Sequence, residues 1–201
     1  MMPLHWLFKP LTLVLALVWV ATAHVAARAP VFLKVLLLVA LLASLIGDTL
    51  LMLPGNFFIA GLVAFLSAHL AYIVLLKRST PGSGTTPSRK ALWGTLGYGA
   101  LMMTLLWSGL PGPVMRGAVA AYVVVIALMA AQAMGRAVLR ADAASRWVAW
   151  GACFFMLSDS LLAINKFMQP LPTASLWILS TYYIAQVLIM RHVLLGASKN
   201  D

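Results

Sequence analysis

The sequence predicts an all-α protein, a polytopic transmembrane helical bundle of about seven helices that forms one integral-membrane domain over residues 1–201. Hydrophobic residues make up 63% of the chain and charged residues 9%, which is too little charge to cover a soluble globule. Seven apolar stretches are each long enough to cross about 30 Å of hydrocarbon. The expected helices are Leu11–Ala27, Val31–Leu53, Phe57–Leu76, Ala91–Gly109, Val114–Gly135, Trp147–Asn165 and Thr173–Met190.

The joins between these stretches contain residues that end helices. Proline stands at position 30, at 54 before a glycine, at 111 and 113 around a glycine, and at 170. The sequence STPGSGTTPS at 79–88 predicts a flexible loop between the third and fourth helices, and basic residues separate the fifth from the sixth. The helices are therefore expected to alternate in direction.

The first stretch has a second interpretation. Lys9 is followed by LTLVLALVWVATA, with small residues at Ala21 and Ala23, which is also the pattern of a cleaved signal peptide. Because the flanking charge is a single lysine and the apolar pattern continues to Ala27, we interpret the stretch as a membrane helix.

The basic residues predict the orientation. Lysines and arginines are enriched in the loops that face the cytoplasm. Eleven of the fourteen fall after the first, third and fifth helices or in the C-terminal tail, and three fall on the other side. The three are Lys9, Arg116 and Lys166. We therefore expect a multi-pass protein of the bacterial inner (plasma) membrane, with the N-terminus outside and the C-terminus in the cytoplasm. The net charge of +10 is accounted for by these loops, so the expected partner is the lipid bilayer and not nucleic acid.

Two acidic side chains lie inside apolar sequence. Of four acidic residues, Asp48 stands in LLASLIGDTLLML and Asp159 in FFMLSDSLLAIN. An ionisable group in a bilayer costs at least a few kcal/mol, so it faces the protein interior and marks a candidate site. The alternative is structural: two carboxylates could lock helices together through a shared proton.

The two aspartates also lie on an internal repeat. A shift of 111 residues places Asp48 on Asp159 and Tyr72 on Tyr183 without a gap. Both pairs combine a helix that carries an aspartate with a returning helix that carries a tyrosine. We therefore predict a parallel repeat of helix pairs, the second with the third and the sixth with the seventh.

The returning helices carry the other polar candidates. His69 lies three residues before Tyr72, on the same face of a helix. The last helix carries Thr181, Tyr182, Tyr183 and Gln186. Tyrosine and threonine in membrane helices also serve as hydrogen-bonding contacts between helices, so a purely structural role stays open for them.

Several motifs together resemble the YhhN/TMEM86 family of integral-membrane lysoplasmalogenases. They are Lys9-Pro10, SLIGDTLLML, GLVAFLSAHLAYIVLL, FFMLSDSLLAINKF and TYYIAQVLIM, and the likeness covers nearly the whole chain. Family members usually have eight helices with Lys-Pro opening the second, so we expect this chain to be one N-terminal helix short.

The resemblance implies hydrolysis of the vinyl ether bond of lysoplasmalogens to a fatty aldehyde and a glycerophospho-base. That reaction needs a carboxylic acid that is still protonated near neutral pH and an anion beside the developing cation. A buried pair of carboxyl groups suits both needs. We expect Asp48 and Asp159 to divide the acid and base roles, with His69, Tyr72, Thr181, Tyr182, Tyr183 and Gln186 orienting them or the substrate. Lys9 and Lys166 either bind the phosphate of the lysophospholipid substrate or extend to the interface.

Other functions compete with this one. Buried aspartates on repeated helices also suit the proton relay of a proton-coupled transporter or channel. An intramembrane aspartyl protease would need glycine at Leu45 and tyrosine at Ser158. A zinc hydrolase would need about three converging ligands, whereas His5, His24 and His192 lie near helix ends. We expect no metal and no cofactor.

Overall fold

The computed structural model describes residues 5–22, 30–79 and 88–197, and in these ranges it is an all-helical bundle without strands. The prediction of an all-α bundle is confirmed. The seven helices of the described ranges are α1 (His5–Thr22), α3 (Val31–Met52), α4 (Phe58–Arg78), α5 (Arg89–Leu106), α6 (Gly112–Arg140), α7 (Ala143–Phe167) and α8 (Ala174–Ala197).

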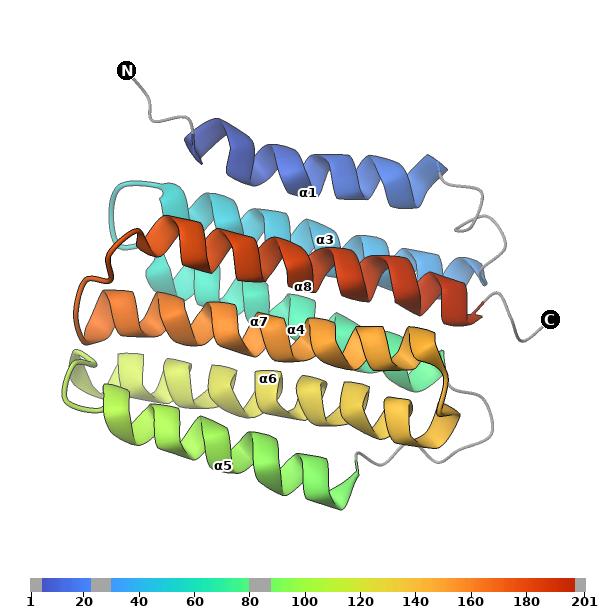
Figure 1. Ribbon diagram of the computed structural model, residues 1–201. Coiled ribbons are helices and arrows are strands. Elements are labelled where there is room, and N and C mark those ends of the chain that lie inside the picture. The colour runs from blue at the N-terminus through green and yellow to red at the C-terminus, as the bar shows by residue number, and fades with distance from the viewer. Residues whose placement is uncertain (1–4, 23–29, 80–87, 198–201) are drawn as a thin grey trace.

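Successive helices run in opposite directions with their axes close to parallel (Figure 1). As Figure 1 is drawn, the α3–α4, α5–α6 and α7–α8 connections lie at the left end of the bundle, and α4–α5 and α6–α7 connect at the right end. Helices α1 and α5 lie at opposite edges, with α4, α6 and α7 between them. Side chains of α4, α6 and α7 can therefore meet inside the bundle.

The composition and length of the helices fit a membrane. Four of the described helices, α3, α4, α6 and α7, are long and apolar enough to cross one. Large apolar side chains also cover the outside, for example Val31, Trp93 and Leu176, each more than 60% exposed. Helices that are apolar on their outer faces as well as inside are typical of a lipid environment. The protein is a multi-pass membrane protein.

The predicted repeat corresponds to two closely packed helix pairs. In α3–α4, a Cβ at Gly47 would lie 2.6 Å from the ring of Phe65, and in α7–α8 a Cβ at Gly151 would lie 2.8 Å from Ile189. Small residues at such contacts let membrane helices approach closely. The first helix of each pair runs from right to left in Figure 1, which makes the pairs parallel.

The first helix differs from its prediction. It begins at His5, six residues before Leu11, and contains Pro10 instead of starting there. A proline inside a helix loses one backbone hydrogen bond, which a membrane helix tolerates when neighbours compensate. The helix ends at Thr22, and residues 23–27 of the expected span, with most of the predicted 79–88 loop, lie outside the described residues.

Three other helices are longer than their apolar runs predict. Helix α7 extends over Ala143–Phe167, beyond the expected Trp147–Asn165, and so includes Arg146. Helix α6 continues past Gly135 to Arg140, so Arg136 and Arg140 belong to a helix and not to a loop, and Arg136 is 1% exposed. Helix α8 continues past Met190 to Ala197. Charged residues with good helix propensity extend a helix beyond the hydrocarbon, and the search for apolar runs stops at the first of them.

Candidate functional site

The two aspartates of the apolar segments lie on α3 and α7, nearer the left end of the bundle. Asp48 is four residues before the end of α3 and Asp159 eight residues before the end of α7, or about 6 and 12 Å of helix. Asp48 is 2% exposed, whereas the side chain of Asp159 is 19% exposed. The same residue type therefore stands in two different surroundings.

Asp159 belongs to a cluster with Tyr122 of α6 and His69 of α4. The Tyr122 hydroxyl donates a hydrogen bond to Oδ2 of Asp159. His69 Nε2 lies 2.8 Å from the Tyr122 oxygen and 3.7 Å from Asp159 Oδ2. Because a tyrosine hydroxyl carries one hydrogen, which here goes to the carboxylate, His69 must donate to Tyr122 from Nε2. The cluster thus fixes the orientation of the carboxyl group.

Asp48 belongs to a second cluster with α8 and α4. The Tyr182 hydroxyl donates a hydrogen bond to Asp48. Gln186 Nε2 donates to the Tyr182 oxygen over 3.2 Å, and Tyr72 donates to Gln186 Oε1 over 2.6 Å. A chain of hydrogen bonds thus joins α3, α8 and α4, and it holds three polar side chains that the bilayer alone could not satisfy.

Aromatic rings lie between the two clusters. The Phe155 ring packs edge-on against His69 of the first cluster, at 4.7 Å between centroids, and against Tyr182 of the second, at 5.4 Å. The Tyr122 hydroxyl nonetheless lies within electrostatic range of both Asp159 and Asp48. Phe155 therefore contacts both clusters, and an electrostatic interaction links Tyr122 of the first with Asp48 of the second.

Asp159 also faces a narrow apolar cavity between α4, α5, α6 and α7, which we call the slot. Its polar residues are Asp159, Tyr122, Tyr98 and Ser160, and Tyr98 donates to Ser160 Oγ over 2.8 Å. Its remaining walls are apolar, with Phe58, Leu106 and Phe167 toward the left end. At about 70 Å³ the slot is small, and its apolar walls suit a hydrocarbon chain.

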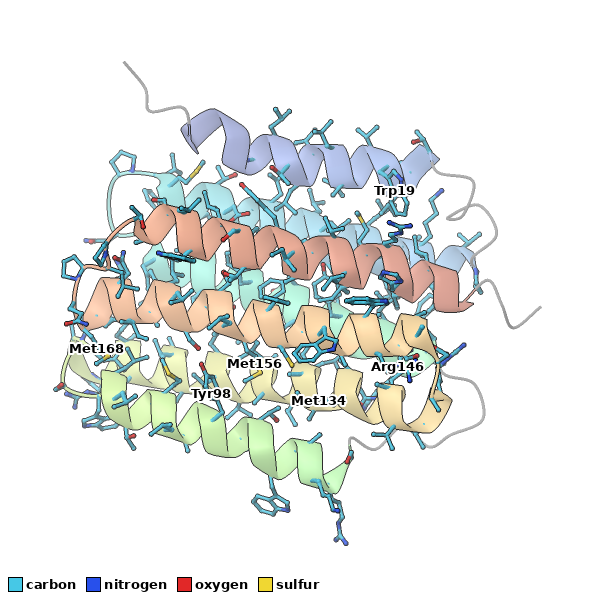
Figure 2. All side chains as sticks on the ribbon, in the orientation of Figure 1. Trp19, Tyr98, Met134, Arg146, Met156 and Met168 are labelled. Carbon is cyan, nitrogen blue, oxygen red and sulfur yellow. The ribbon has the colours of Figure 1, made fainter. Side chains whose placement is uncertain are left out.

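A wider cavity adjoins the slot on the side of α5, α6 and α7; we call it the groove. Tyr98 and Met156, both labelled in Figure 2, line both cavities. The groove has about 500 Å³ of space and extends toward the right end, where Lys90 lines it. Slot and groove thus lie on either side of Tyr98 and Met156, and the Asp159 carboxyl group lines the slot.

Comparison with known proteins fits this architecture. The model of the YhhN family matches residues 4–193. The chain belongs to the YhhN family. No solved structure matches it.

Curated relatives of this YhhN-family chain have names that state an activity. It is 39% identical over 152 residues to "Lysoplasmalogenase TMEM86B" of Sus scrofa, an alignment that covers 75% of the chain and 59% of the relative. It is 34% identical over 156 residues to "Lysoplasmalogenase TMEM86A" of Homo sapiens, covering 75% and 62%. Over 108 residues it is 35% identical to "Uncharacterized membrane protein YhhN" of Escherichia coli O157:H7, covering 53% and 48%. The chain thus spans about 59% of the length of the first of these relatives.

The structure brings four of the predicted orienting or binding residues into the hydrogen-bonded clusters around the aspartates. His69 joins Asp159, while Tyr72, Tyr182 and Gln186 join Asp48. Tyr183 contacts the ring of Tyr182 but points toward Thr12 of α1.

Three other predicted residues lie apart from both clusters or cannot be placed. The Thr181 hydroxyl donates to backbone carbonyls of its own helix, Trp177 and Ile178, which is the structural alternative for a membrane threonine. Lys166 lies over the Phe58 ring at 4.9 Å, and the Lys9 side chain lies outside the described residues. Within the described ranges, no three histidine, cysteine or acidic side chains gather as a metal site would require.

Sequence reasoning missed two tyrosines of the site, Tyr122 and Tyr98. Each is the single tyrosine of its predicted helix and has no counterpart in the 111-residue repeat. The usable signal was a hydroxyl inside an apolar stretch, which must be hydrogen-bonded in lipid. A tyrosine in an apolar stretch therefore indicates that its hydroxyl has a hydrogen-bond partner, but the sequence does not identify that partner.

Proposed function

We propose that this protein hydrolyses the vinyl ether bond of lysoplasmalogens, releasing a fatty aldehyde and a glycerophospho-base. Support comes from its family, from relatives named as lysoplasmalogenases over part of their length, and from the site. The observation that carries the proposal is the carboxyl group of Asp159 on the wall of a slot whose apolar lining suits a hydrocarbon chain. A lysoplasmalogen has one hydrocarbon chain, and its reactive carbons adjoin the head.

In this proposal Asp159 is the proton donor. Its carboxylic acid transfers a proton to the β-carbon of the vinyl ether, and the double-bond electrons form the new C–H bond. The α-carbon and the ether oxygen then share the positive charge of an oxocarbenium ion. The Asp159 carboxylate left behind lies beside that cation and stabilises it, as the carboxylate of a glycosidase does.

Water completes the reaction. The Asp159 carboxylate removes a proton from a water molecule as its oxygen bonds to the α-carbon, which gives a hemiacetal. Asp159 then donates its proton to the glycerol oxygen as that C–O bond breaks, and it takes up the proton that the hemiacetal hydroxyl releases as the aldehyde C=O bond forms. One water is consumed and the carboxyl group ends unchanged in net charge, so no co-reactant is needed.

The neighbours of Asp159 have positioning roles. Tyr122 donates to the carboxyl group and so selects which oxygen faces the slot, while His69 fixes Tyr122 from behind. Tyr98, whose hydroxyl donates to Ser160, lines both the slot and the groove, and its ring can hold the substrate beside Asp159. Such preorganised donors stabilise developing charge without having to reorganise.

Asp48 acts at a distance in the same proposal. Asp48 is not among the described residues that line the slot. Its negative charge acts on the site over a distance, since the Tyr122 hydroxyl lies within its electrostatic range. A second anion near the first stabilises the cation once it has formed. Asp48 therefore has an electrostatic role in this proposal, and Asp159 takes both the acid and the base role that we expected the two aspartates to divide.

The test is aldehyde release from purified protein with three lysolipids that share chain length and head group. The 1-alkenyl lipid should yield a fatty aldehyde, whereas the 1-alkyl ether and the 1-acyl ester should not react. The Asp159→Asn variant, purified in parallel, controls for contaminating hydrolases. Fatty acid released from the 1-acyl lipid would make the protein an esterase. Absence of aldehyde together with proton uptake by proteoliposomes would favour the transporter alternative.

A further inference from the structure

The groove differs from the slot in width and in charge. None of the described residues that line the slot is basic, whereas the groove is lined by Lys90 at its right end. The groove is also the wider of the two, at about 500 Å³ against about 70 Å³. A lysophospholipid has the same asymmetry, with a thin apolar chain on one side of the ether bond and a broad anionic head on the other.

We propose that the groove binds the head of the lysophospholipid and that Lys90 contacts its phosphate. The identity of the substrate rests on the proposed function; the site and its ligand chemistry rest on the two cavities. The hydrocarbon chain then lies in the slot toward the left end, and the reactive bond lies between Asp159 and Tyr98, which lines both cavities.

The dimensions agree with this placement. Lys90 lies eight residues before Tyr98 on α5, or about 12 Å along the helix. A glycerol bridge from ether oxygen to phosphorus and a lysine stem from Cα to Nζ each contain about five bonds, and each spans roughly 6 Å when extended. The two extended lengths together equal the separation of Lys90 and Tyr98 along α5. A substrate phosphate in the groove is therefore within reach of the Lys90 ammonium group when the ether oxygen lies at Tyr98.

The surroundings of Lys90 leave its ammonium group accessible. The residue is exposed in the first turn of α5, and the groove between it and Tyr98 is lined by small side chains, Ala91, Gly94 and Thr95. At Gly94 a Cβ would meet no atom within 4 Å. Lysine binds phosphate as a flexible point charge, so no fixed fork geometry is required.

Lys166 is the rival for this role. It lies at the left end, and its ammonium group stacks over the Phe58 ring at the apolar end of the slot. For Lys166 to bind the phosphate, the head would have to occupy the narrow slot, and several polar atoms would lose their hydrogen bonds to water. The geometry therefore favours Lys90.

The test measures binding, so that it does not depend on turnover. The ligands are a 1-alkyl lysophosphoethanolamine, whose saturated ether cannot be cleaved, and the 1-alkylglycerol of equal chain length, which lacks the phosphate. Dissociation constants are measured for the full chain in detergent micelles by displacement of a fluorescent lysolipid. The variants are Lys90→Gln, Lys166→Gln and the matched control Arg89→Gln, which neutralises the adjacent exposed charge outside the groove.

Lys90→Gln should raise the dissociation constant of the phospholipid about tenfold, since loss of one charged contact is worth roughly one decade of affinity. The same variant should bind the alkylglycerol like the wild type, and Arg89→Gln should change neither ligand by more than about twofold. Equal effects of Lys90→Gln and Arg89→Gln would overturn the proposal, as would a phosphate-dependent loss in Lys166→Gln alone. Aldehyde release by the wild type decides the proposed function separately.

Discussion

Asp48 and Asp159 show how one residue type in nearly the same local sequence acquires two chemical characters. Both follow a small residue and precede a hydroxyl and two leucines. Asp48 is packed under Tyr182 at 2% exposure, whereas Asp159 keeps 19% of its side chain exposed and lines the slot. A group that transfers a proton to a substrate must reach it, so our proposal assigns the chemical step to Asp159.

The first prediction compares the two aspartates. Asp159→Asn should lower kcat by about 10²–10⁴-fold, the usual contribution of general acid–base catalysis, because the amide cannot donate the proton. Asp48→Asn should lower kcat less, since Asp48 acts by charge alone. Losses should be non-additive in the double variant. Aldehyde release per folded protein is the measurement, and near-normal turnover in Asp159→Asn would rule out the proposed mechanism.

The second prediction concerns Tyr122. Tyr122→Phe keeps the ring but removes the hydrogen bond to Asp159, and it leaves His69 Nε2 without its acceptor. A hydrogen bond to a charged group is worth about 1.5–3 kcal/mol, so kcat should fall roughly 10- to 100-fold. The matched control is Tyr183→Phe, which lies outside both hydrogen-bonded clusters. Equal kcat values for the two variants would contradict the positioning role.

The sequence was sufficient to find the aspartates and insufficient to find Tyr122. A carboxylate in apolar sequence stands out because its burial is costly wherever it lies. A tyrosine is compatible with lipid, an interface or a core, so its importance depends on the Asp159 carboxyl group on another helix. Thr181 shows the opposite error. The sequence suggested a site residue, but the Thr181 hydroxyl donates its hydrogen bond to the backbone carbonyl of Trp177 in its own helix.

At the scale of the helix, close packing of α3 on α4 positions Asp48. Our third prediction is that Gly47→Ala destabilises the protein by about 1–3 kcal/mol, the usual cost of overpacking, because its Cβ would meet the Phe65 ring at 2.6 Å. Gly97→Ala is the matched control, since a Cβ there meets no atom within 4 Å. Thermal unfolding in detergent measures both, and an equal melting temperature for the two variants would contradict the packing argument.

The start of α7 supplies a fourth prediction. Asp142 caps this helix by accepting a hydrogen bond from Ser145 N over 2.6 Å, and Arg140 Nε donates to it over 2.8 Å. Burial alone would raise the pKa of Asp142, but the hydrogen bonds and the charge of Arg140 lower it from 3.8 to about 2. The lowered pKa stabilises the fold above about pH 4, and this contribution disappears as the pH falls from 4 to 2.

Two variants separate the cap from the charge. Asp142→Asn should keep most of the cap but flatten this part of the stability–pH profile, because asparagine does not titrate. Asp142→Ala should lose both the helix cap and the titrating charge, and the free energy of unfolding should fall by about 0.5–2 kcal/mol at neutral pH. Thermal unfolding between pH 2 and 7 makes the comparison. A profile for Asp142→Asn as steep as that of the wild type would assign the slope to another group.

Helix boundaries were the least predictable part of the fold. Apolar runs located every helix core, but α6 ends only where Ala141 adopts a left-handed conformation with φ of 52° and Asp142 caps the next helix. Between Gly135 and that turn lies Arg136, whose burial at 1% depends on neighbouring helices. The local sequence shows where the apolar, membrane-spanning run ends. The helix itself ends where other partners satisfy its terminal backbone groups, and that point can lie several residues further on.

At the scale of the whole molecule, the two ends of the bundle differ in charge. Lys77, Arg78, Arg89 and Lys90 flank the α4–α5 connection at the right end, and Arg140 and Arg146 flank α6–α7. Around the described left-end connections, the basic residues are Arg116 and Lys166. Because basic loops remain in the cytoplasm, we propose that the right end is cytoplasmic. The groove and Lys90 then open to the cytoplasmic leaflet, and the lysolipids of that leaflet are the substrates within reach.

Reporter fusions test this orientation, which is our fifth prediction. A reporter active only outside the cytoplasm should be inactive when fused at Gly82 and active when fused at Asn56, and a fluorescent protein that folds only in the cytoplasm should give the opposite result. The reversed pattern would place Lys90 at the outer leaflet and exclude the cytoplasmic-leaflet substrates. Replacing Lys77, Arg78, Arg89 and Lys90 together with glutamine should weaken the bias and yield mixed topologies, because the positive residues near short loops determine orientation. If that variant keeps a single orientation, the helices themselves must fix it, and the charge difference between the two ends is a consequence of the topology.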